Sequence, residues 1–127
     1  MRHLRLSTLL GREQASFHDA KINKVQLDYV KREVIFDCLL CTDAEDWLSG
    51  RLIFEGLLFF VSESPDETHS YEDALDISSD GSVFEVKADW PKFPSDLPET
   101  AFIHYFYVNN WNRCLFIGAT EARFEWD

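Results

Sequence analysis

Residues 24–40, KVQLDYVKREVIFDCLL, are the part of the sequence that decides the predicted fold. Apolar side chains alternate with polar ones on both sides of the charged triplet at positions 31–33. A period of two is typical of a β-strand with one buried face, whereas helical patterns repeat about every 3.6 residues. We therefore expect an antiparallel hairpin. Its buried face would carry Val25, Leu27, Tyr29, Val34, Phe36, Cys38 and Leu40.

The middle of the chain continues the same period. We expect one long apolar strand from Arg51 to Ser62, bent at Gly56. The Asp80-Gly81 pair is a tight-turn signal, and it predicts a strand over the residues that follow it, Val83–Ala88. Two other places carry signals for a short helical turn: Thr42 with Glu45, and Ser70 with Asp73 ahead of Ala74 and Leu75.

The last third of the chain predicts further strands. The prolines between Trp90 and Pro98 make that stretch an extended connector, because proline cannot donate to a strand ladder. Strands are then expected over residues 101–108 and 114–117, joined by a turn over residues 109–112. On the final strand the inward-facing residues are Ala122, Phe124 and Trp126.

These segments together predict an all-β fold with minor α content. We expect an antiparallel β-sandwich or flattened barrel of seven or eight strands, with one or two short helical turns. The strands belong to a single β-rich domain over residues 17–127. Residues 1–16 form an N-terminal extension, either mobile or helical.

The charge of the chain is strongly acidic and unevenly distributed. The formal net charge is −11, since 23 acidic residues outnumber 12 basic ones. Seven basic and four acidic residues give residues 1–36 a net charge of +3, while five and nineteen give residues 37–127 a net charge of −14. Such a surface repels phosphate backbones and anionic lipids, so we expect neither nucleic acid nor a membrane surface as a partner.

The densest acidic stretch covers fourteen residues without a basic one. Two interpretations remain open for it: a solvated loop, or a docking surface for a basic protein partner, whose association such a field would accelerate. A calcium-binding loop is not expected, because the stretch lacks the D-x-[DN]-x-[DN]-G spacing. The candidate partner-binding residues are Glu63, Asp66, Glu67, Glu72, Asp73 and Asp76.

A histidine and an aspartate stand side by side just before the first predicted strand. His18 and Asp19 match the pair that ligates metal in phosphohydrolases of the HD type, but two ligands do not hold a catalytic divalent ion. We favour a structural role, in which Asp19 fixes the entry to the strand by hydrogen bonds from its side chain to the backbone. A metal-dependent hydrolase built on this pair is the least favoured function.

The three cysteines are too few for a secreted disulfide framework, and we expect them to be reduced in a cytoplasmic protein. Cys38 and Cys41 have the spacing of a zinc knuckle, yet residues three apart on a strand point to opposite faces. With Cys114 as the only other cysteine, we expect buried thiols and no metal site. We also expect no membrane span and no signal peptide, because the apolar runs are too short.

The aromatic strand near the end of the chain suggests a second type of site. His104 lies between two phenylalanines on one face of that strand and is expected to hydrogen-bond a neighbour in the core. Trp111 lies in the following turn, where an indole either folds back onto the sandwich or serves as a ligand platform. If these groups surround a pocket, its residues are His104, Tyr105, Tyr107 and Trp111.

No enzyme motif stands out, since the chain has no glycine-rich phosphate loop and no known nucleophile or metalloprotease signature. We therefore expect a non-catalytic protein without a metal or another cofactor. Exposed strand edges would allow a homodimer.

Two segments resemble a known group of proteins. The first runs from Phe17-His18-Asp19-Ala20-Lys21-Ile22 into the first hairpin, and the second is Tyr105–Asn112 followed by residues 119–126. Both resemble small bacterial β-proteins in which a His-Asp-Ala element precedes the first hairpin. Some of those are similar to the immunity proteins of bacterial polymorphic toxin systems. The resemblance implies a β-rich fold without catalytic residues.

The leading functional expectation is an acidic, immunity-type inhibitor that docks a basic protein. The alternative is a β-sandwich that binds a small ligand in an aromatic pocket.

Overall fold

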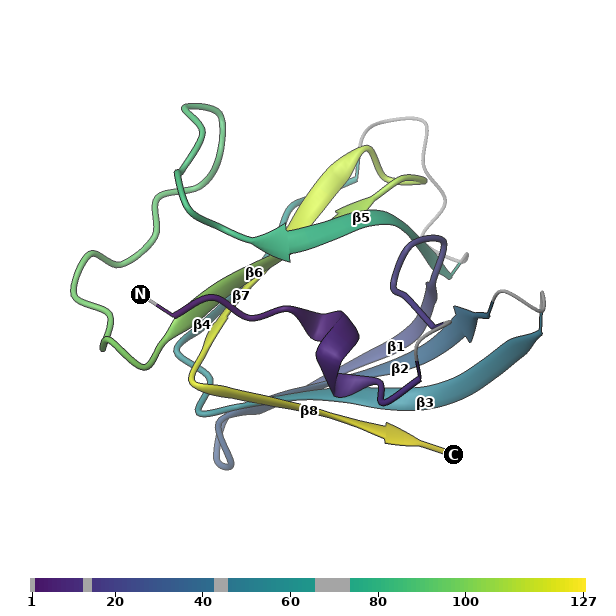
Figure 1. Ribbon diagram of the computed structural model, residues 1–127. Coiled ribbons are helices and arrows are strands. Elements are labelled where there is room, and N and C mark those ends of the chain that lie inside the picture. The colour runs from purple at the N-terminus through teal and green to yellow at the C-terminus, as the bar shows by residue number, and fades with distance from the viewer. Residues whose placement is uncertain (1, 13–14, 43–45, 66–73) are drawn as a thin grey trace.

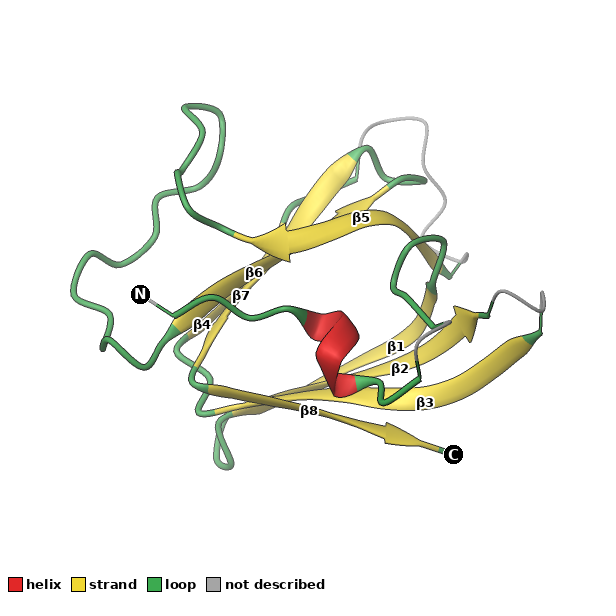
Figure 2. Ribbon diagram, in the orientation of Figure 1, coloured by secondary structure: helices red, strands yellow, loops and turns green. Residues whose placement is uncertain are grey.

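The computed structural model describes residues 2–12, 15–42, 46–65 and 74–127 of the protein (Figure 1). These residues form a short 3-10 helix, η1 (Leu6–Leu9), and eight strands (Figure 2). The predicted all-β fold is confirmed. In the described part of the chain, no helix has the length and apolar character that a membrane crossing needs. The strands are β1 (Lys21–Asp28), β2 (Glu33–Cys41), β3 (Trp47–Glu55), β4 (Phe59–Ser62), β5 (Leu75–Ser82), β6 (Phe102–Val108), β7 (Arg113–Ala119) and β8 (Glu121–Trp126).

The strands form one antiparallel sheet in the order β4-β7-β6-β5-β1-β2-β3-β8. Strand β5 links the two halves of this sheet. Its first two residues pair with β1, and residues 77–82 pair with β6. The sheet folds over at β5 into two layers and does not close, which is consistent with the predicted sandwich or flattened barrel (Figure 1).

The predicted hairpin is confirmed as β1 and β2. Asp28 pairs with Glu33 at its end, and the carboxylate of Asp28 accepts hydrogen bonds from the backbone N–H groups of Val30 and Lys31. The buried face of β2 is as predicted. On β1, however, the prediction is wrong: Val25 and Leu27 remain 37% exposed, and Tyr29, just beyond the strand, is 81% exposed.

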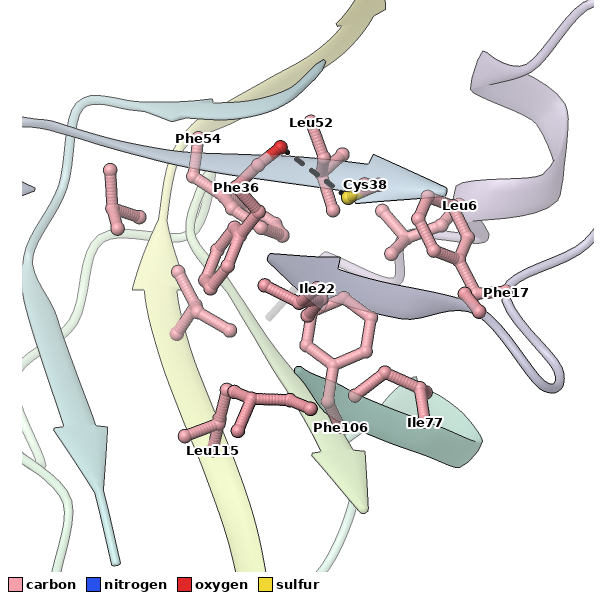
Figure 3. Packing of buried hydrophobic residues seen from close by; sticks show 14 of the residues in the cluster. Leu6, Phe17, Ile22, Phe36, Cys38, Leu52, Phe54, Ile77, Phe106 and Leu115 are labelled. Carbon is pink, nitrogen blue, oxygen red and sulfur yellow. Dashed lines mark hydrogen bonds between the residues drawn. The ribbon is translucent and has the colours of Figure 1, made fainter. Parts of the chain in front are cut away.

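The main hydrophobic core lies between the two layers (Figure 3). Phe36, Phe54 and Phe106 are fully buried, and the ring centroid of Phe36 lies 5.8 Å from that of Phe54 and 5.9 Å from that of Phe106. Burying each such side chain contributes about 1.5–3 kcal/mol. A second, smaller core lies on the outer side of β6 and β7 and contains Val83, Ile103, Cys114 and Phe116.

The single strand predicted from Arg51 to Ser62 is wrong, because the structure divides this stretch into β3 and β4. Gly56 separates them with a φ of +60°. Strand β3 pairs with β2 and β8, whereas β4 pairs with β7 in the other layer. The hydrophobic pattern did not reveal the break, since both strands bury apolar residues.

The strand predicted over Val83–Ala88 is also wrong. Asp80 and Gly81 lie inside β5 and pair with Phe106 and Tyr105 of β6. The available partner strand overrides the local turn preference of the Asp-Gly pair. The chain then leaves the sheet, and residues 83–101 contain no strand. Within this segment, the predicted extended connector from Trp90 to Pro98 is confirmed.

The predicted helical turns are not present in the described residues. Trp47 already begins β3 and Leu75 begins β5, because both find strand partners. Glu45, Ser70 and Asp73 lie outside the described residues. The prediction for the last third of the chain is confirmed for β6, for β7 and for the turn over residues 109–112 that joins them. It is also confirmed for the partly buried residues of β8, Ala122, Phe124 and Trp126.

The N-terminal segment, residues 2–12 with η1, covers the side of the sandwich between β5 and β8 (Figure 1). Leu6 and Leu10 are buried in the main core. The Oγ of Ser82 both accepts a hydrogen bond from the N–H of Leu4 and donates one to its carbonyl, at 3.0 and 2.9 Å. The indole of Trp126 donates to the carbonyl of Leu10 at 2.7 Å. This segment is therefore part of the packed fold.

Adding a methyl group at Gly56, where the chain passes from β3 in one layer to β4 in the other, should lower the stability of the protein. A Cβ on Gly56 would collide with the hydroxyl of Thr120. The φ of +60° at this position is also unfavourable for any residue that has a Cβ. We expect Gly56→Ala to lower the free energy of unfolding by about 2–4 kcal/mol in chemical denaturation.

Gly11→Ala is the matched control. Gly11 has a similar φ of +63°, but its Cβ would meet no atom within 4 Å. Its cost should be about 1 kcal/mol, from the backbone alone. Equal losses in the two variants would show that the contact with Thr120 is unimportant.

Candidate functional site

A cleft lies on the outer face of β5, β6 and β7, beside the irregular segment 83–101. It has a volume of about 790 Å³. Tyr105, Tyr107 and Trp90 line it, and the Tyr107 hydroxyl donates to the side chain of Asn112. The charged side chains around it are Glu63, Glu85, Lys87, Asp89 and Arg113.

Aromatic packing holds the irregular segment against the sheet. The ring of Trp90 lies 5.0 Å from that of the buried Phe116, and the ring of Phe93 lies 5.1 Å from it. Phe93 also stacks on Phe59 of β4 at 5.2 Å. These contacts position one wall of the cleft without any strand pairing.

His104 does not belong to this cleft, because successive side chains of a strand point to opposite faces. It is fully buried on the inner face of β6, and its ring centroid lies 5.2 Å from that of Phe106. Its Nε2 lies 2.8 Å from the carboxylate of Asp80, as expected for a hydrogen-bonded core histidine. Among the described residues, its Nδ1 has no hydrogen-bond partner.

The four predicted pocket residues are therefore not brought together. Tyr105 and Tyr107 share the outer cleft, whereas His104 is buried on the opposite face of β6. Trp111 packs against the main core, as in the first of the two interpretations given to it. Strand alternation alone separates His104 from the tyrosines.

A second cleft, of about 630 Å³, lies beneath the N-terminal segment. His3, His18 and His104 all line it, together with Arg5 and Asp80. The ring of His3 packs edge-on against Phe84 at 4.1 Å. Three of the four histidines of the chain thus line one cleft, which their scattered positions in the sequence did not indicate.

His18 and Asp19 fix the entry to β1, although not in the predicted way. The Nδ1 of His18 lies 2.6 Å from the carbonyl of Ser78, and the backbone N–H of Asp19 donates to the carbonyl of Ile77 at 2.8 Å. Asp19 has a φ of +63°, and its carboxylate is exposed. The backbone of Asp19 makes this connection, and the contact found for its carboxylate among the described residues is with Nε2 of His18, at 3.5 Å. The described residues contain no group of three or more candidate metal ligands.

The predicted acidic surface is only partly described. Asp66, Glu67, Glu72 and Asp73 lie outside the described residues. The other two make specific contacts. The carboxylate of Glu63 accepts a hydrogen bond from the N–H of Cys114 at 2.9 Å, and that of Asp76 pairs with Lys21 at 3.0 Å.

The acidic character of the chain extends beyond the stretch from Glu63 to Asp76 that the sequence analysis singled out. Exposed carboxylates continue through the irregular segment at Glu85, Asp89, Asp96 and Glu99. Two apolar side chains stand exposed among them, Phe84 at 66% and Val86 at 52%. A wider charge window would have found this extension, since residues 63–100 contain eleven acidic residues and two basic ones.

No protein-family model matches this chain, and no curated protein or solved structure is significantly similar to it.

The cysteines lie apart. Cys38 is buried in the main core and Cys114 in the smaller one, while Cys41 is partly exposed. Burial raises the pKa of the Cys38 thiol to about 12. Burial, followed by the negative charge of Glu63, raises the pKa of Cys114 to about 11.

The three thiols should differ in their rates of alkylation. A thiol reacts as its thiolate, and at about pH 8 Cys38 and Cys114 are almost entirely protonated as well as buried. With iodoacetamide and mass spectrometry, we expect Cys41 to be labelled at least about tenfold faster than the other two. In denaturant all three should react at similar rates. Rapid labelling of Cys38 in the folded protein would contradict the assigned burial.

Proposed function

We propose that this protein is a non-catalytic binding protein that docks a basic protein partner. The docking surface is the exposed part of the irregular segment, Phe84–Asp89, together with the adjoining outer cleft. The observation that carries the proposal is the exposure of Phe84 and Val86 on either side of Glu85. Exposed apolar side chains within a charged surrounding are typical of protein interaction sites.

The charges of this surface favour a basic partner. Glu63, Glu85 and Asp89 line the cleft together with two basic residues. One of these, Lys87, lies with its ammonium 5.2 Å from the ring centroid of Trp90, so an aromatic ring already contacts a cation here. An acidic rim would accelerate association with a basic surface, and apolar anchors would then slow dissociation.

The resemblance to immunity proteins favours an inhibitory role for such a complex. An immunity-type protein that binds its partner stoichiometrically acts by covering the partner's active surface. This mechanism needs no catalytic residue on the covering protein.

The alternative is a small ligand in the outer cleft. Its volume of about 790 Å³ and its lining by Tyr105, Tyr107 and Trp90 favour this second candidate. A ligand enclosed there would contact the aromatic rings directly. Tyr105→Ala would then abolish binding, whereas substitution of the exposed Val86, which does not line the cleft, would have little effect.

Affinity capture from the native lysate tests the protein-docking proposal. We expect a basic protein to be retained at low ionic strength and released at about 0.5 M salt, where charges are screened within a few ångströms. The double variant Glu85→Lys with Asp89→Lys should retain at least about tenfold less of that protein, because attraction becomes repulsion.

The control is Asp46→Lys with Asp127→Lys, which changes the net charge equally. Both residues are exposed, and Asp127 follows β8, away from the irregular segment (Figure 1). This control should bind as the wild type does. The proposal would be overturned if the amount of protein retained did not depend on salt concentration, or if it fell equally in both double variants.

A further inference from the structure

Within the described part of the chain, strand β1 has a free backbone edge over most of its length, and only its residues Lys21 and Ile22 pair with β5. Residues 24–28 pair with β2 on one side, and among the described residues no backbone hydrogen bond reaches their other side. Unpaired N–H and C=O groups of this kind are a template for another strand.

The same edge exposes apolar surface. Val25 and Leu27 lie in register with the buried Phe36 and Val34, so they belong to the inner face of the layer. Each is nevertheless 37% exposed, and Tyr29, just beyond the strand, is 81% exposed. A groove of about 450 Å³ lies between this end of β1 and β4.

The sequence of the edge is complementary to itself. Reading outward from Gln26, the neighbours on both sides are apolar, Val25 and Leu27, and the next residues are oppositely charged, Lys24 and Asp28. In an antiparallel pair of two such strands with Gln26 opposite Gln26, Lys24 of each copy faces Asp28 of the other. Val25 of each copy faces Leu27 of the other. Opposite charges and apolar pairs directly across a ladder are both stabilising.

Other pairings lose this match. A slip by two residues removes both ion pairs, and a parallel arrangement places Lys24 against Lys24. A lysine on an edge strand commonly discourages the addition of another strand. Among these pairings, the two-fold antiparallel register alone neutralises the charge of Lys24, because it places Asp28 of the second copy opposite. The arrangement is closed, so it produces a dimer and no fibre.

We propose that two copies of this chain associate through residues 24–28 of β1, antiparallel about a two-fold axis at Gln26. The ion pairs lie on the outer face and the apolar pairs on the inner face, beside the groove next to β4. The carboxylate of Asp28 uses one oxygen for the turn of the hairpin, which leaves the other for Lys24 of the second copy. A ladder of five residues is a small interface, so the dimer dissociates on dilution.

Sedimentation velocity over a dilution series tests the interface. We expect a concentration-dependent dimer for the wild type and an increase of at least about tenfold in its dissociation constant for Lys24→Glu, which creates two like-charge pairs. Lys31→Glu is the matched control: Lys31 is also exposed, but it lies in the turn, outside the ladder. The control should dimerise as the wild type does. A wild type that stays monomeric at all concentrations overturns the proposal.

Cross-linking tests the register. Opposite residues of an antiparallel pair have Cα atoms about 4.5–5.5 Å apart, within the range of a disulfide. In mild oxidant, Gln26→Cys should therefore form a covalent dimer, whereas the wild type with its native cysteines and Lys31→Cys should not. A dimer that is insensitive to Lys24→Glu and not captured by Gln26→Cys would use another surface, and the proposal would be wrong.

Discussion

The backbone of β5 forms hydrogen bonds with β1 at its first two residues and with β6 along the remainder. A shift of register between Ile77 and Ser79 accompanies the change of direction. Because one strand belongs to both layers, the sheet must fold over at this point. The entry to β1 is held by the carbonyls of Ile77 and Ser78, and the N-terminal segment is held by Ser82. Strand β5 is thus the common support of the layers, of the first strand and of the segment that covers the core.

The elements that sequence reasoning predicted correctly are those with local causes. The β1–β2 and β6–β7 hairpins follow from alternation around a short turn, and the connector near Trp90 follows from its prolines. The misplaced elements depend on distant partners. The chain passes to the other layer at Gly56 because β4 finds its partner, β7, there. The Asp80-Gly81 pair stays extended because it pairs with β6. No local pattern contains that information.

The candidate site was predictable to a similar extent. The acidity of the region around Glu63 was visible in the sequence, and so was the burial of His104. The grouping of His104 with Tyr105 and Tyr107 ignored the two faces of a strand, so the sequence itself could have corrected it. The exposure of Phe84 and Val86 was not predictable, since a strand was expected there and the segment instead leaves the sheet.

The closing N-terminal segment has a consequence for how the chain folds during synthesis. Its hydrogen bond from Trp126 to Leu10 joins residues 116 positions apart, and the bonds between Leu4 and Ser82 join residues 78 apart. The ribosome synthesises this segment well before its partner on β8, Trp126. Until then Leu6 and Leu10 have no completed core to enter. The nascent chain must carry them exposed, and a fold dominated by such distant contacts forms slowly compared with a helical bundle of the same length.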